Sequence, residues 1–290
     1  MNFLGSMTIS QPTPTEFIAT IERKGTRRTT PAGSGEVVWR VFGGGEPLVL
    51  LHGGTGSWLH WVRNIEDLAR DFLLIVPDIP GSGESANPEP PPTADRIAAS
   101  MLAGLDSIIG AESGFAIAGF SMGGMLACHI AHHAGTRARC LVLVGSAGLP
   151  VPRPTMEPLV VWRRLPTEEQ KRAAHRRNLE ILMLYDPRKI DELAVHIQAA
   201  NAAQARVRGK HVTPTSALAR CLQDFSGRLA GIWGEHDATA APYFAERRDF
   251  LQKFQPAASF DILPGVGHWV QYEAPEAFNT RLREVVKRGA

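Results

Sequence analysis

The sequence is poor in cysteine, and its cysteines form no metal-binding or redox motif. The chain has 290 residues, of which 3 are cysteines: Cys128, Cys140 and Cys221. They form no C-x-x-C pair, and any disulfide scheme leaves one of them unpaired. This usage argues against a disulfide-stabilised secreted protein and favours a reducing compartment, so we expect a cytoplasmic protein.

Long apolar runs and an excess of one charge are also missing. No run approaches the roughly 20 apolar residues that a membrane-spanning helix needs, so we expect no transmembrane segment. A formal net charge of +2 gives the chain as a whole no attraction to nucleic acid. Residues 1–10 lack the basic segment and the apolar run of a secretory signal. We expect residues 1–15 to be a disordered tail.

Short apolar stretches alternate with helical patterns along most of the chain. Continuous apolar stretches separated by helices are typical of parallel strands that are buried on both faces. The sequence therefore predicts an α/β fold with a doubly wound, mostly parallel sheet. The expected strands lie at residues 37–41, 48–51, 73–76, 115–118, 140–144, 229–233 and 259–263, and the expected helices at 58–70, 94–109, 123–134 and 275–288.

The alternation stops at residues 149–222, where no strand pattern occurs. This segment carries 13 Lys and Arg against 7 Asp and Glu. We interpret it as a helical lid inserted between two parts of the core, residues 16–148 and 223–290. Its basic side chains leave two interpretations open, a solvated surface or a site for an anionic substrate, because Arg matches carboxylate geometry.

A serine flanked by glycines follows the apolar stretch at 115–118. The run GFSMG at residues 119–123 has the pattern G-x-S-x-G and leads into a helical pattern. Such a turn strains the serine backbone, and its crowding requires small residues two positions before and after the serine. The hydroxyl then lies at the carboxyl edge of the sheet, where open α/β sheets bind ligands. We therefore predict that Ser121 is a nucleophile.

A serine nucleophile needs a base and a group that orients the base. His268 follows the last expected strand, and Asp237 follows the strand before it. Both lie at carboxyl ends of strands, so the three side chains can converge. Glu235 and Asp224 are alternatives for the acid, and we favour Asp237.

In these residues the sequence resembles the α/β-hydrolase superfamily over nearly the whole chain. The resemblance implies that Ser121, Asp237 and His268 form a catalytic triad. It also implies an oxyanion hole made by backbone N–H groups of Met122 and of Gly54, or of Thr55, in the glycine-rich loop after residues 48–51. We expect His52, which precedes this loop, to support it and to take no part in proton transfer.

The run GHWVQYE at residues 267–273 resembles the meta-cleavage-product hydrolases, which break a carbon–carbon bond in dienoic keto acids. In that family a Trp after the histidine helps to build the site, and Trp269 matches it. The family has Asn where this chain has Phe120, and its lid arginine falls near residues 196–197, which hold no arginine. Arg188 or Arg206 is a candidate substitute. We expect Thr55, Phe120 and Trp269 to bind substrate.

The preferred interpretation is a serine hydrolase of small carboxylic esters, with carbon–carbon bond hydrolysis second. A cofactor-free haloperoxidase or perhydrolase, and a non-catalytic ligand-binding member, stay open. A dehalogenase or an epoxide hydrolase would need Asp in place of Ser121.

We expect no cofactor and no metal. The histidines at 129, 132 and 133 have helical spacing, but no carboxylate or cysteine at coordinating spacing completes a metal-ligand set with them. The expected partner is a small-molecule substrate, neither nucleic acid nor a membrane, and a homo-oligomer is compatible with the sequence.

Overall fold

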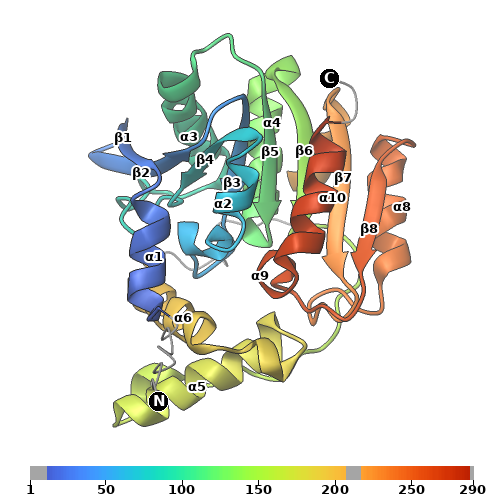
Figure 1. Cartoon of the computed structure of the whole chain (residues 1–290). Coiled ribbons are helices and arrows are strands. Elements are labelled where there is room, and N and C mark those ends of the chain that lie inside the picture. The colour runs from blue at the N-terminus through green and yellow to red at the C-terminus, as the bar shows by residue number, and fades with distance from the viewer. Residues whose placement is uncertain (1–11, 207–216, 288–290) are drawn as a thin grey trace, which may run out of the picture.

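The structure of the chain, a computed structural model, describes residues 12–206 and 217–287. A sheet of eight strands forms the centre of this described part (Figure 1). The strands are β1 (Thr26–Ala32), β2 (Gly35–Phe42), β3 (Glu46–Leu51), β4 (Phe72–Pro77), β5 (Phe115–Phe120), β6 (Ala138–Val144), β7 (Arg228–Gly234) and β8 (Ser259–Leu263).

The strand order in the sheet is β1-β2-β4-β3-β5-β6-β7-β8. β2 pairs antiparallel with β1 and with β4, and all the other neighbours pair parallel. The prediction of an α/β fold with a mostly parallel sheet is therefore confirmed. All seven predicted strands are present, each within two residues of its expected ends.

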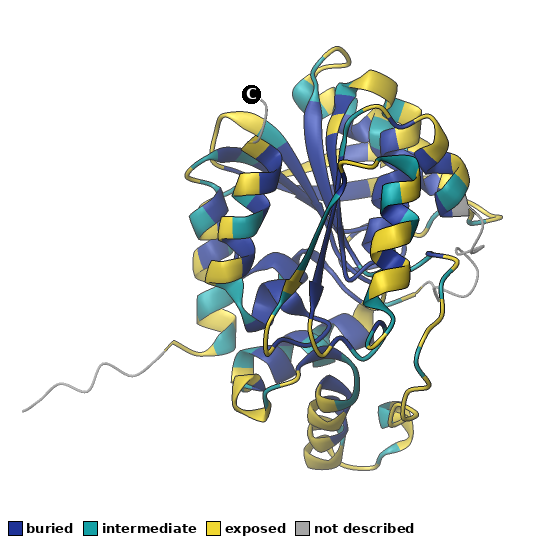
Figure 2. Cartoon of the chain, turned by 90° about the vertical axis from the view of Figure 1, so that its right-hand side faces the viewer, coloured by how far each residue is buried: buried dark blue, intermediate teal, exposed yellow. Residues whose placement is uncertain are grey.

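Helices cover both faces of the sheet, because alternate strand residues point to opposite faces and both sets are apolar. Figure 2 shows the result: buried strands lie between helices whose outward surfaces are exposed. One face packs against α1 (Pro14–Glu22), α2 (Ile65–Leu68) and α10 (Pro275–Lys287). The other packs against α3 (Ala94–Ile109), α4 (Met122–Ala134), α7 (Ala217–Gln223) and α8 (Phe244–Phe254).

The sequence pattern missed β1, and the reason is its place at the edge of the sheet. Its sequence TRRTTPA is polar and mostly exposed. An edge strand needs no continuous apolar run, and it tolerates proline because one side of the strand has no hydrogen-bonding neighbour. The pattern also missed α8.

The helix expected at residues 58–70 is broken into two short pieces. A 3-10 turn covers Trp58–Trp61, and α2 begins only at Ile65. Trp58, Trp61 and Val62 are all buried at the i, i+3, i+4 spacing of one helical face, so the apolar pattern correctly indicates a helical face but does not reveal that the helix is interrupted.

The sequence analysis predicted no helix before residue 58 and so missed α1, which begins inside the predicted tail. Thr13 caps α1 through a capping box with Glu16, so the predicted tail boundary at residue 15 falls inside this helix. Residues 1–11, the rest of that predicted tail, lie outside the described residues.

The segment predicted to be a lid, residues 149–222 and called the lid below, contains no strand where it is described. Its helices are α5 (Glu168–Asn178), a π-helical turn (Leu179–Met183) and α6 (Glu192–Gln204). Figure 1 shows α5 and α6 beyond the end of the sheet toward which β5 and β7 point. α7, at the end of the predicted lid, packs instead on α4 in the body.

Within residues 12–206 and 217–287, no helix combines the length and the apolar character that crossing a membrane requires.

Candidate active site

Ser121 lies in a strained turn between β5 and α4. Its φ is 52° and its ψ −116°, a left-handed conformation that L-residues rarely adopt. The turn is tight enough to demand glycine on both sides. A Cβ on Gly119 would lie 2.2 Å from the Gly123 carbonyl oxygen, and one on Gly123 would lie 2.3 Å from the His52 carbonyl oxygen. The crowding expected from the G-x-S-x-G pattern is therefore present at both glycines.

His268 and Asp237 form a buried hydrogen-bonded pair. His268 Nδ1 lies 2.9 Å from Asp237 Oδ2, and the Asp237 side chain has no exposed surface. The other carboxylate oxygen, Oδ1, accepts hydrogen bonds of 2.8 Å from both the backbone N–H and the hydroxyl of Thr239. Because ionised Asp237 only accepts, the Nδ1 proton of His268 points at it, and Nε2 is left as the basic nitrogen.

The surroundings of Asp237 keep it ionised. Burial raises the pKa of this carboxyl, but His268 and the hydrogen bonds from Thr239 outweigh burial, so the pKa lies below its ordinary value. Of the alternative acids, Glu235 accepts a hydrogen bond from Gly265 N at 2.9 Å, and no bond joins Asp224 to His268 in the described residues.

The loop after β6 brings the serine turn and the histidine together. Ala147 N donates to the Ser121 carbonyl oxygen at 3.0 Å. Two residues earlier, Gly145 has φ 49°, and a Cβ there would lie 3.1 Å from His268 Nδ1. The Phe120 ring, next to Ser121, lies 4.8 Å from the His268 ring. The turn that carries Ser121 therefore lies beside the His268–Asp237 pair, at the carboxyl ends of β5, β7 and β8.

The glycine-rich loop after β3 lies against the start of α4. A Cβ on Gly54 would be 3.8 Å from the Met122 Cβ, so the backbones of the two predicted oxyanion donors are neighbours. His52 fixes the loop as expected: its Nε2 accepts from Ile79 N at 2.9 Å, so its Nδ1 donates to the Gly53 carbonyl at 2.7 Å. Burial lowers the pKa of His52, and Asp78 and the Gly53 carbonyl offset this only in part.

His60 is a second supporting histidine, which the sequence analysis missed. Its Nδ1 accepts from Gly53 N at 3.2 Å, and its ring packs against Phe120 and Trp269 with centroids 5.4 and 5.0 Å away. Burial lowers the pKa of His60 well below its usual value, and His52 and His268 nearby lower it further. His60 is therefore neutral at pH 7, as acceptance from Gly53 N requires.

We expect the buried neutral histidines to make stability pH-dependent. The folded protein lowers the pKa of His52, His60 and His175, mainly through burial, whereas the unfolded chain takes up protons near pH 6.5. Stability is then complete above about pH 6.5 and decreases as the pH falls below it. Thermal unfolding between pH 8 and pH 5 measures this. His60→Asn, which keeps an acceptor for Gly53 N, should flatten the dependence, and the exposed control His132→Asn should not; equal slopes in all three proteins would contradict the assignment.

The residues predicted to bind substrate lie in two different places. Thr55, with φ 51°, lines a cavity of about 450 Å³ between the loop after β3 and the lid, here called the lid cavity. Phe120 and Trp269 are 1% and 0% exposed and pack against His60. Trp269 Nε1 also donates to the His60 carbonyl at 3.0 Å. Phe120 and Trp269 are not among the residues that line the lid cavity, and their role in binding substrate stays a prediction.

Glu273 joins the lid to the turn that carries His268. This 3%-exposed carboxylate accepts three backbone hydrogen bonds: from Gly267 at 2.7 Å, from Tyr185 at 3.2 Å and from Asp186 at 2.6 Å. In the same region, Trp269 N donates to the Met183 carbonyl at 2.7 Å. The sequence analysis did not single out Glu273.

We expect Glu273→Gln to lower kcat roughly tenfold, because one carboxylate oxygen becomes an NH₂ group that faces a backbone donor. Losing the bond to Gly267 or to the lid would shift the His268 turn, so kcat should fall more than KM rises. Ester kinetics on Glu273→Gln beside Glu276→Gln, an exposed glutamate nearby, measures this. A kcat within twofold of the wild type would show that Glu273 does not position the histidine.

Two arginines considered as substrate-binding residues are engaged elsewhere. Arg188 is 89% exposed and forms an ion pair with Asp186 at 2.8 Å. Arg206 donates to Asn87 Oδ1 at 3.0 Å and to the Gly83 carbonyl at 3.1 Å. Neither lines the lid cavity. The hypothesis that one of them replaces the lid arginine of meta-cleavage-product hydrolases is therefore not supported.

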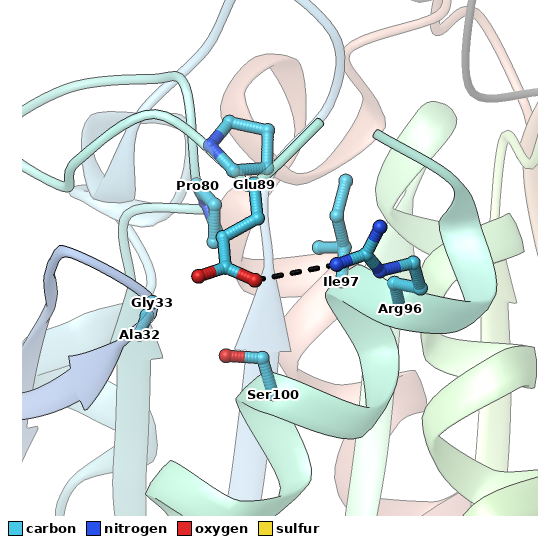
Figure 3. Close-up of a pocket in the computed structure, with 8 residues that line it drawn as sticks. Ala32, Gly33, Pro80, Glu89, Arg96, Ile97 and Ser100 are labelled. Atoms are coloured by element: carbon cyan, nitrogen blue, oxygen red, sulfur yellow. Dashed lines mark hydrogen bonds and ion pairs between the residues drawn. The ribbon is translucent and has the colours of Figure 1, made fainter. Parts of the chain in front are cut away.

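A separate surface pocket lies between the β1–β2 turn and α3. Figure 3 shows Glu89 and Arg96 in it, and the two pair at 3.2 Å. None of the predicted site residues lines it.

The histidines on α4 have neighbours that sequence spacing could not predict. His129 Nδ1 lies 3.5 Å from Cys221 Sγ, and His133 Nε2 lies 2.9 Å from Asp95 Oδ1. In the part of the chain that the structure describes, no group of three or more His, Cys, Asp or Glu is arranged to hold a metal.

Comparisons with known proteins identify the family. Residues 48–281 match the alpha/beta hydrolase family. A 2-hydroxy-6-oxononadienedioate/2-hydroxy-6-oxononatrienedioate hydrolase of Pseudomonas putida is 30% identical over 260 residues, which cover 81% of this chain and 86% of that protein. A pimeloyl-(acyl-carrier protein) methyl ester esterase of Vibrio parahaemolyticus is 38% identical over 109 residues, 38% of this chain and 40% of that protein.

Solved structures with a similar fold include an esterase. The crystal structure of an esterase from Rhodococcus sp. ECU1013 superposes with a TM-score of 0.71 and 21% identity, over 92% of this chain and 100% of that one. The family match covers most of the chain, including the serine turn, Asp237 and His268. This chain belongs to the alpha/beta hydrolase family, and the protein is a hydrolase.

Proposed function

We propose that the protein is a serine hydrolase of small carboxylic esters, with Ser121 as nucleophile, His268 as base and Asp237 as the group that orients the base. The observation that carries the proposal is the buried 2.9 Å bond from His268 to Asp237, whose second oxygen is held by Thr239. A histidine fixed in this tautomer, next to a serine in a strained turn, is suited to acyl transfer.

The proposed reaction has two halves. His268 Nε2 takes the proton of Ser121, whose Oγ attacks the ester carbonyl. The backbone N–H groups of Gly54 and Met122 stabilise the oxyanion, and each such donor typically lowers the barrier by about 2.7–4 kcal/mol. His268 then protonates the departing alcohol. Water, activated by the same histidine, hydrolyses the acyl-enzyme and regenerates Ser121.

Hydrolysis of a carbon–carbon bond is the second candidate, and the 30% identical relative from Pseudomonas putida favours it. Two features of the chain favour an ester instead: Phe120 replaces the Asn of the meta-cleavage-product hydrolases, and no arginine occupies residues 196–197.

Two further alternatives make different predictions. A haloperoxidase or perhydrolase would oxidise halide with peroxide and acetate, and a ligand-binding member would bind a ligand tightly with negligible turnover.

For the cell compartment, we propose the cytoplasm, since Cys128, Cys140 and Cys221 are all buried free thiols.

Labelling with a fluorophosphonate probe, read by intact mass, tests the proposal together with turnover of short p-nitrophenyl esters. We expect one adduct on the wild type and rapid ester turnover. Labelling without ester turnover, but with turnover of a dienoic keto acid, would transfer the proposal to the carbon–carbon reaction. No labelling would overturn both.

A further inference from the structure

The lid cavity contains a single charged side chain among its described lining residues. On the body side the cavity is lined by Gly54, Thr55 and His60. On the lid side most of its lining is apolar, and the charged residue there is Arg163. Since Gly54 lies beside Met122, the cavity adjoins the predicted oxyanion hole, and a substrate that reaches Ser121 can extend through it toward Arg163.

Arg163 is held in place without an acidic partner. Its Nη2 donates to the Ala202 carbonyl at 2.6 Å, and its guanidinium carbon lies 4.6 Å from the centre of the Trp162 ring. Ala202 and Trp162 line the same cavity. No Asp or Glu of residues 12–206 and 217–287 forms an ion pair with Arg163.

Other basic residues of the lid differ from Arg163 in this respect. Lys171 pairs with Glu168 at 2.6 Å, Arg172 pairs with Glu192, and Arg177 pairs with Glu157 at 2.6 Å. The positive charge of these side chains is therefore compensated within the lid, while that of Arg163 is not. Burial lowers the pKa of the neighbouring His175, and the positive charge of Arg163 lowers it further.

We propose that Arg163 binds the carboxylate of the substrate, so that the preferred substrates are esters carrying a carboxylate at the end remote from the scissile bond. This inference rests on the proposed function and adds the substrate class to it. A guanidinium offers parallel N–H donors that fit the two oxygens of a carboxylate. Stacking on Trp162 and the bond to Ala202 restrict the side chain, so less freedom is lost when the carboxylate binds.

The rest of the cavity fits the chain that joins the two ends of such a substrate. Its volume of about 450 Å³ suits a small ligand. Leu159, Leu182 and Met183 line it between the body and the lid, and they offer apolar contact to methylene groups. A substrate with an ester at one end, methylenes in the middle and a carboxylate at the other end is therefore complementary to the cavity along its length.

The test compares a half-ester with its neutral counterpart. Monomethyl and dimethyl esters of the same straight-chain dicarboxylic acids, from four to eight carbons, are hydrolysed by the wild type, Arg163→Gln, Arg163→Lys and Arg164→Gln. The readout is the ratio of kcat/KM for the half-ester to that for the diester. Arg164 is the matched control, because it is the adjacent arginine and does not line the cavity.

We expect the wild type to prefer the half-ester at one or more chain lengths. Because the guanidinium is partly exposed to solvent, Arg163→Gln should lower the ratio by only about three- to tenfold, mainly through KM. Arg163→Lys should retain part of the preference, and Arg164→Gln should leave it unchanged. Raising the ionic strength should weaken the wild-type preference, which tests the inference even if a variant folds poorly.

A wild type that hydrolyses diesters at least as well as half-esters at every length would overturn the carboxylate site. So would a preference that Arg163→Gln leaves intact. Both results leave ester hydrolysis at Ser121 standing, because they still require turnover of the diesters. If no ester of either kind is turned over, it is the proposed function that fails.

Discussion

Ser121→Ala is expected to reduce ester kcat/KM by roughly 10⁴-fold or more, because it removes the hydroxyl oxygen that we propose forms the acyl-enzyme. The residual rate would come from the oxyanion donors and from substrate binding. Labelling by the fluorophosphonate probe should disappear in the same variant.

The structure indicates that this loss of activity will occur without unfolding. The Ser121 side chain makes no capping hydrogen bond to α4, so its removal leaves no donor of that helix unpaired. Ala has the same Cβ atom as Ser, so the substitution does not change the backbone strain at φ 52°. Ser107→Ala, on the surface helix α3, is the control and should retain full activity. A Ser121→Ala protein that keeps more than a few per cent of wild-type turnover would exclude the serine mechanism.

Ser121 could be predicted from the sequence because its environment is local. The glycines that the turn demands lie two residues away on each side, and the apolar strand and the helix pattern adjoin them. The central strands β3 to β7 were predictable for a similar reason, since each contains a continuous apolar run. β1 was not, because an exposed edge strand carries no such run.

His60 and Glu273 could not be predicted, because what they do depends on contacts between distant segments. His60 lies in an apolar run whose sequence resembles an ordinary buried helix, and only the fold places its Nδ1 against Gly53 N. Glu273 meets Tyr185 and Asp186 across separations of 88 and 87 residues. Arg163 differs from Arg172 and Arg177 in lacking an acidic partner and in lining the lid cavity, and the composition of the lid reveals neither property.

Asp237→Asn is expected to lower kcat by roughly 10³- to 10⁴-fold, and the contacts of Asp237 explain why the isosteric change is so damaging. Oδ1 accepts two hydrogen bonds from Thr239, so the amide oxygen of Asn must take that position. The NH₂ group then faces His268 Nδ1 and donates to it. The proton of the neutral ring moves to Nε2, which can no longer accept the proton of Ser121.

The pH profile separates this tautomer effect from a general loss of structure. If the defect is loss of the base at His268, the residual activity of Asp237→Asn should rise with pH as hydroxide replaces that base. The unfolding temperature measured at pH 7 should fall by much less than the activity. Glu235→Gln, which alters the alternative acid two residues away, should keep activity within a few-fold of the wild type. Comparable losses in the two variants would mean that Asp237 is not the residue that orients His268.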